Sequence, residues 1–138
     1  MTQEDKDLLL KDLCARLPYN VKVHAKYTDL GETIELDGIV KMIDGDGVVG
    51  VEVINDFSSA WTYVQIDNVK PYLFPMSSMT EEQIKEVLST KHKINLPSGK
   101  VIYLDSLNTF GFYNKNHIDA NNLLSTGLAN DATGLNIY

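Results

Sequence analysis

The 138 residues of this chain suffice for one compact domain but are too few for most complete two-domain enzymes. The chain has 12 basic and 19 acidic residues, and its net charge of −7 opposes binding to nucleic acid or to an anionic membrane surface. The single cysteine excludes an internal disulfide, and we find neither a leader nor an apolar run near the roughly 20 residues of a membrane span. We therefore expect a cytoplasmic protein without a membrane partner.

The first segment has the pattern of an amphipathic helix. Thr2 stands before the acidic residues Glu4 and Asp5, which suit a helix N-terminus, and Pro18 marks the end. The apolar residues at helical spacing are Leu9, Leu10, Leu13, Cys14 and Leu17. We accordingly expect Cys14 to be a small buried hydrophobe rather than a nucleophile.

An antiparallel meander is expected after the helix. Between residues 20 and 66, apolar and polar residues alternate with the period of two that half-buried strands show, and turn residues separate the segments. A tight turn at 67–71 leads into a short extended piece, and a bent meander closed in this way has the shape of a small SH3-like barrel. The four expected strands cover residues 21–27, 34–42, 48–54 and 60–66.

The clearest local signal in the chain starts a helix near residue 80. Thr80 and Gln83 have the spacing of a capping box, and Met79 and Ile84 occupy the two positions of a hydrophobic staple.

Beyond that helix we expect a short hairpin and further helices. The hairpin spans residues 91–104, and Asp105 or Ser106 is placed to cap the next helix. Asn116 or His117 is placed to open a last helix that stops at Gly127. The fold class is therefore α+β, with an N-terminal helix, a bent meander, a helix, a hairpin and C-terminal helices.

We expect a single domain over residues 1–138. The helix and meander occupy residues 1–75, the α/β C-terminal part occupies 76–138, and no flexible linker separates them. Acidity is concentrated near the front, where residues 1–60 hold 6 basic and 12 acidic side chains. Such a front suits a protein partner with a basic surface, including a DNA-binding protein.

Three short motifs match known sites only in part. Gly45 to Gly50 spells G-x-G-x-x-G but opens a β-branched run rather than a helix, so we interpret it as a hairpin turn. Asp44 and Asp46 lack the other ligands of a calcium loop, and residues 98–100 lack the first glycine of a phosphate-binding loop.

No catalytic or metal-binding residue follows from local spacing. His24, His92 and His117 have no close partner at ligand spacing, and one cysteine cannot build a structural zinc site. We assign no catalytic, metal or cofactor-binding residue and expect no cofactor. An enzyme site assembled from distant residues stays open as an alternative.

The best candidate for a binding patch is aromatic. Trp61 and Tyr63 share one face of the fourth expected strand, opposite Val64 and Ile66. If that opposite face is core, the aromatic pair points outward and forms a patch with the nearby Phe57. The other interpretation, which we favour, is that the C-terminal helices cover the pair, because they must bury their own apolar stripe.

Three stretches carry a resemblance: residues 10–19 (LKDLCARLPY), 68–83 (NVKPYLFPMSSMTEEQ) and 132–138 (ATGLNIY). With them the chain resembles a group of small uncharacterised proteins encoded by phages and mobile elements of gut Bacteroides-type bacteria. The resemblance implies a bacterial or phage cytoplasmic context and supplies no activity or functional residue.

Our leading hypothesis is a non-catalytic protein-interaction module of phage or mobile-element origin, for which a homo-oligomer is one arrangement. One alternative is a small hydrolase or nucleotide-handling enzyme. The other is weak nucleic-acid binding by an SH3-like barrel through Trp61 and Tyr63, against which the net charge argues.

Overall fold

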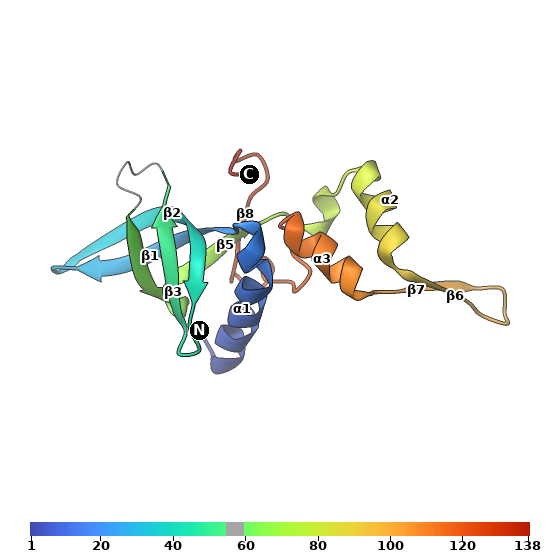
Figure 1. The fold of residues 1–138 in the computed structure, drawn as a ribbon, viewed down its shortest axis with the longest axis horizontal. Helices are drawn as coiled ribbons and strands as arrows, with labels where there is room; N and C mark the ends of the chain where they lie inside the picture. Colours follow the sequence, from blue (N-terminus) through green and yellow to red (C-terminus); the bar gives the residue numbers. More distant parts are fainter. Residues whose placement is uncertain (55–59) are drawn as a thin grey trace.

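The computed structural model describes residues 1–54 and 60–138, and it places a mostly antiparallel sheet and a pair of helices at opposite ends of an elongated molecule (Figure 1). The expected α+β class is confirmed. The α-helices are α1 (Gln3–Arg16), α2 (Glu81–Thr90) and α3 (Leu107–Lys115). The strands are β1 (Lys22–Asp29), β2 (Glu32–Ile43), β3 (Val48–Val53), β4 (Trp61–Gln65), β5 (Val69–Leu73), β6 (His92–Asn95), β7 (Val101–Leu104) and β8 (Asn130–Asp131). Short 3-10 turns are η1 (Leu17–Tyr19), η2 (Ile66–Asn68) and η3 (Met76–Ser78).

Helix α1 begins at the expected place and buries a different face from the expected one. Thr2 and Asp5 form a capping box, since each side chain accepts the backbone N–H of the other. The buried side chains of α1 are Leu9, Asp12, Leu13 and Arg16. Cys14 is exposed, so the expectation that it is buried is wrong. The reason is that the face toward the core includes a charged pair in place of further apolar residues.

The larger sheet has the strand order β4-β3-β2-β1-β5-β8. Strands β1 to β4 form the expected antiparallel meander, and η2 is the tight turn that returns the chain so that β5 pairs with β1. Strands β4 and β8 are the two ends, and within residues 1–54 and 60–138 no ladder joins them. The structure therefore shows an open sheet, and a closed SH3-like barrel is not formed by these pairings.

Two glycines in the meander explain its local geometry. A Cβ on Gly38 would lie 2.2 Å from Val51 Cγ1 and 2.6 Å from the Glu52 carbonyl oxygen, so only glycine lets β3 approach this closely. Gly47 has φ +83° in the β2–β3 turn, where its N–H donates to the Asp44 carbonyl. The G-x-G-x-x-G motif is thus a hairpin turn followed by a strand, as expected.

The C-terminal part follows the expected order up to α3. The capping box of Thr80 and Gln83 is present at the start of α2, and β6 and β7 form the expected hairpin. After α3 the expected last helix is wrong, because the chain continues as successive turns. Positive φ angles at His117 (56°) and Asn122 (61°) interrupt any helix there.

The main core lies between α1 and the sheet. Leu9 and Leu13 of α1 pack with sheet residues, and Leu123 and Leu128 of the C-terminal segment join the same cluster. Helices α2 and α3 share a second, smaller cluster, which consists of Val87, Phe112, Tyr113 and Ile118. The second cluster is too small to cover both helices, so much of their surface faces solvent.

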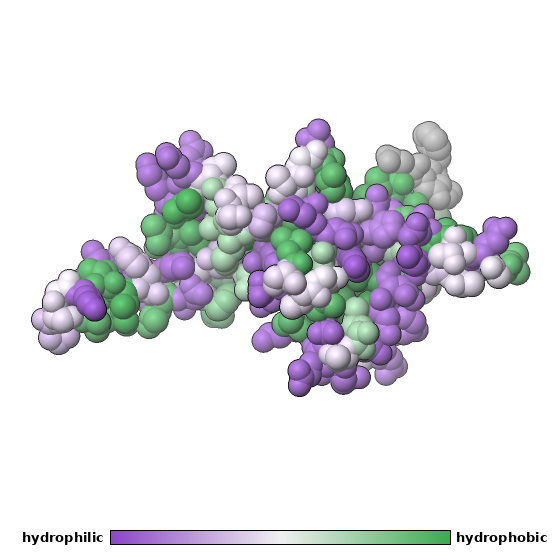
Figure 2. Space-filling model, turned by 180° about the vertical axis from the view of Figure 1, so that it is seen from behind, coloured by the Kyte–Doolittle hydropathy of each residue, from purple (hydrophilic) through white to green (hydrophobic). Residues whose placement is uncertain are grey.

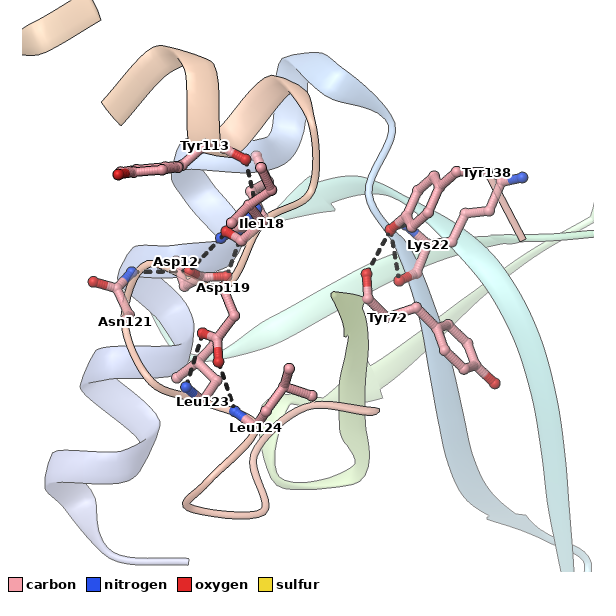
Figure 3. Close-up of polar contacts among 11 residues, drawn as sticks. Asp12, Lys22, Tyr72, Tyr113, Ile118, Asp119, Asn121, Leu123, Leu124 and Tyr138 are labelled. Atoms are coloured by element: carbon pink, nitrogen blue, oxygen red, sulfur yellow. Dashed lines mark hydrogen bonds and ion pairs between the residues drawn. The ribbon is translucent and has the colours of Figure 1, made fainter. Parts of the chain in front are cut away.

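A buried polar network fastens α1 to the segment after α3. Arg16 and Asp12 are both 0% exposed and pair at 2.9 Å between Nε and Oδ2. Arg16 also donates to the carbonyl oxygens of Tyr113 and Ile118, at 3.3 and 2.6 Å, and Asn121 donates to Asp12 (Figure 3). The network satisfies both charges and connects residues about a hundred positions apart in the chain.

Candidate functional site

A polar cluster lies beside a hollow of about 480 Å³ on the sheet, which Asp37 and Tyr72 help to line. Tyr72 donates its hydroxyl proton to Asp37 Oδ1 at 2.6 Å, and His24 Nδ1 lies 3.0 Å from the same oxygen. Burial raises the pKa of Tyr72 well above its usual range, and the hydrogen bond to Asp37 raises it further. Tyr72 is therefore a hydrogen-bond donor rather than a base near neutral pH.

The residues of the cluster form ion pairs between the neighbouring strands β1 and β2. The other ring nitrogen of His24 lies 3.6 Å from Glu35 Oε1, and Lys26 pairs with the same carboxylate at 3.2 Å. Hydrogen bonds from Lys26 and His24 lower the pKa of Glu35. Carboxylates therefore flank His24 on both sides. Among the described residues that line the hollow, none is a serine or a cysteine.

A second hollow, of about 460 Å³, is lined in part by His117 and Tyr138. The two rings stack with centroids 3.7 Å apart, and Tyr138 is fixed by hydrogen bonds to the backbone of Lys22 and Tyr72 (Figure 3). Burial lowers the pKa of His117 to about 4, aided by the positive charges of Arg16 and Lys22. His117 is a neutral imidazole that packs the tail onto the sheet, and in the described part of the chain its Nδ1 has no hydrogen-bond partner.

The structure does not assemble the histidines and the cysteine into one site. Cys14 lies on α1, His24 on β1, His92 on β6 and His117 after α3. Within residues 1–54 and 60–138, no group of three His, Cys, Asp or Glu side chains is arranged to hold a metal ion.

The arm, residues 92–104, is the most unusual surface feature. It consists of β6, β7 and their turn, and it projects beyond α2 and α3 at the end of the molecule opposite the sheet (Figure 1). Every residue of both strands is exposed, so the ladder packs against no other layer formed by residues 1–54 and 60–138. An isolated two-stranded hairpin is marginally stable in water and usually needs a third strand or a helix against it. The exposed apolar side chains of the arm are Ile94, Val101, Ile102, Tyr103 and Leu104.

The helices at the base of the arm add to this apolar surface. Leu107 and Phe110 of α3 are 90% and 50% exposed, and Ile84 and Leu88 of α2 are also exposed. Figure 2 shows hydrophobic residues on the projecting arm and on the helical end next to it. We call the arm's five exposed apolar residues, with these four, the arm surface. An exposed apolar surface of this kind is a candidate site of contact with another molecule.

The β4 edge is the side of strand Trp61–Gln65 that pairs with no described strand, and it is a second exposed surface. Trp61 and Tyr63 are 47% and 61% exposed, whereas Val64 on the opposite face is buried. The expectation that C-terminal helices cover the aromatic pair is therefore wrong, because α2 and α3 lie at the other end of the molecule (Figure 1). Phe57, the third residue of the expected patch, lies outside the described residues.

The sequence predicts a hairpin at the arm, but it does not predict that the hairpin forms an exposed surface. The available signal was the run Val101–Leu104, which places apolar side chains on both faces of a strand. A strand that is apolar on both faces is usually covered on both faces, either within its own fold or by another molecule. No third strand or covering helix was identifiable beside it in the sequence.

Comparisons with known proteins find no matching protein family, no matching curated protein and no matching solved structure. No helix in residues 1–54 or 60–138 has both the length and the apolar character to cross a membrane.

Proposed function

We propose that the protein is a non-catalytic protein-interaction module and that the arm surface is its main binding surface. The single observation that carries the proposal is a two-stranded hairpin that projects from the molecule with apolar side chains exposed on both faces. A free hairpin can bind by adding a strand to another sheet, while its apolar side chains fill pockets on the partner.

The charge of the arm indicates which partner surface it fits. Residues 91–104 contain three lysines and no acidic residue. Lys91 is paired with Asp105 at 3.1 Å, which leaves Lys93 and Lys100 as the charges of the arm itself. We infer a protein partner whose contact surface is apolar at its centre and acidic at its rim.

The biological context of the proposal rests on the resemblance alone. The three matching stretches support an origin in a phage or mobile element and a role in the bacterial cytoplasm. In that context the acidic front, residues 1–60, is free to meet a basic protein while the arm binds elsewhere.

A retention experiment tests the proposal. The tagged wild type, the arm variant Ile102→Lys/Leu104→Lys and the control variant Leu30→Lys are each incubated with lysate of a Bacteroides-type bacterium, crosslinked and analysed by mass spectrometry. Leu30 is 97% exposed in the β1–β2 turn, away from the arm, so its change controls for added charge. Circular dichroism confirms that each variant is folded.

We expect specific proteins to be retained by the wild type and by Leu30→Lys and lost from the arm variant. Recovery of the same proteins with all three chains, or of none above background, would contradict the proposal.

Nucleic-acid binding is the second candidate, favoured by the exposure of Trp61 and Tyr63 on the sheet. The net charge of −7 opposes it. A gel shift at low salt decides the matter, because electrostatic binding is strongest there and a null result excludes this function.

A further inference from the structure

We propose that the arm of one copy pairs with the β4 edge of a second copy, so that the chain assembles head to tail. This inference rests on the proposed function and deepens it by naming a second copy of the chain as one partner of the arm surface, beside the proteins that the retention experiment would find.

Strands β4 and β7 are both short strands that lie at the edge of their sheets. Strand β4 has five residues and ends the sheet, and among the described residues it pairs only with β3. Strand β7 has four residues and pairs only with β6 in that same part of the chain. Each therefore presents an open row of backbone donors and acceptors, and pairing the two rows satisfies both.

The side chains of the two strands also fit. Strand β4 carries no charged residue and exposes Trp61 and Tyr63 on one face. Strand β7 is apolar throughout, with Val101 and Tyr103 on one face and their alternates on the other. If the two strands pair, an apolar face of the arm lies beside Trp61 and Tyr63. Contacts between aromatic and β-branched side chains on neighbouring strands stabilise a sheet.

The charges of the two surfaces favour a contact between the arm and the β4 edge over a contact between two arms. The arm carries Lys93 and Lys100, so two arms side by side would bring like charges together. The β4 edge directly follows the acidic front, residues 1–60, in the sequence, and one acidic residue lies near each end of the strand. Glu52, which also pairs with Lys41, is opposite Trp61, and Asp46 lies in the turn before Val48, the partner of Gln65.

The shape of the molecule sets the mode of assembly. The arm and the sheet lie at opposite ends, so one copy cannot satisfy its own β4 edge with its own arm (Figure 1). A contact between two different surfaces repeats from copy to copy and produces an open chain or a closed ring.

The decisive experiment mixes two defective copies of the full chain. The arm variant Ile102→Lys/Leu104→Lys keeps an intact β4 edge, and the edge variant Trp61→Lys/Tyr63→Lys keeps an intact arm. Mass is measured by size-exclusion chromatography with light scattering over a concentration series, with Leu30→Lys as the control. We expect a mass that rises with concentration for the wild type and the control, monomers for each defective copy alone, and a dimer that grows no further for their equal mixture.

Other outcomes overturn the inference. If the edge variant associates as well as the wild type, the arm meets another surface or another arm, and head-to-tail pairing is wrong. A wild type that stays monomeric at every concentration also overturns it. The proposed function survives either result if the retention experiment still finds arm-dependent partners, so the two failures are distinguishable.

Two further measurements keep the test decisive. If a lysine pair unfolds the chain, threonine at the same positions keeps strand propensity and removes the apolar area. Hydrogen exchange at backbone amides of β4 and β7 is expected to slow on assembly of the wild type and to be unchanged in either variant alone. Equal exchange rates in dilute and concentrated wild type would contradict strand pairing.

Discussion

Removing Arg16 should destabilise the whole fold, because its charge and Asp12 are buried together. In Arg16→Met, a side chain of similar length leaves the Asp12 carboxylate in a site that is 0% exposed, where Asn121 is its one remaining side-chain donor among the described residues. The carbonyl oxygens of Tyr113 and Ile118 lose their charged donor in the same step. Breaking a buried pair from one side costs about 3–5 kcal/mol, a large part of the roughly 5–15 kcal/mol that stabilises a typical domain.

The assay is urea unfolding followed by circular dichroism, with Asp12→Leu/Arg16→Met as a second variant. The double variant removes the unpaired charge, so we expect it to be more stable than Arg16→Met although the two carbonyls still lack donors. Lys6→Met is the matched control. Lys6 pairs with Asp67 at 3.2 Å on the surface, and its loss should cost less than about 1 kcal/mol.

A loss below about 1 kcal/mol for Arg16→Met, similar to the control, would refute this reasoning. It would mean that water reaches Asp12 in the variant and that the network does not hold α1 to the C-terminal segment.

The remaining predictions concern a histidine, two glycines and the cysteine. The pKa of His117 is about 4 in the fold against 6.5 in the unfolded chain, so the unfolded chain binds a proton more readily and stability falls as pH drops from 6.5 toward 4. His117→Asn keeps a residue that tolerates the positive φ. In urea titrations between pH 6.5 and 4, its free energy of unfolding should fall less steeply with pH than that of the wild type. Gly38→Ala should lower the unfolding free energy by about 1–3 kcal/mol because its Cβ would overlap Val51. Gly111→Ala in α3, where nothing lies within 4 Å of the added Cβ, should raise the unfolding free energy by about 0.5–1 kcal/mol. Equal effects of the two substitutions would contradict the close approach of β3 to Gly38. Cys14 is exposed and should react with a thiol reagent in the native protein nearly as fast as in urea, a result that a buried thiol would not give.

Local signals in the sequence were sufficient for the elements that depend on neighbouring residues. The capping box at Thr80 and Gln83 involves side chains three positions apart, and the meander follows from a period of two with turn residues between strands. Both were predictable because no distant part of the chain decides them.

Local sequence signals could not predict which face of α1 is buried or whether Trp61 and Tyr63 are exposed. An Asp12–Arg16 pair at a spacing of four is ordinary on an exposed helix surface, and only the carbonyls of Tyr113 and Ile118 make it a buried one. The same long-range attachment holds α3 against α1, away from Trp61. The exposed state of the candidate patch therefore depends on contacts that no sequence window contains.

The junction of the first helix with the last turns also has a consequence for synthesis of the protein. Leu9 and Leu13 share their core with Leu123 and Leu128, so the N-terminal helix cannot complete its packing until almost the whole chain has left the ribosome. A nascent chain that ends in the arm would expose both the uncovered helix and the apolar hairpin. Premature termination within the last 20 or so residues should therefore yield chains that aggregate or are degraded, rather than a smaller folded protein.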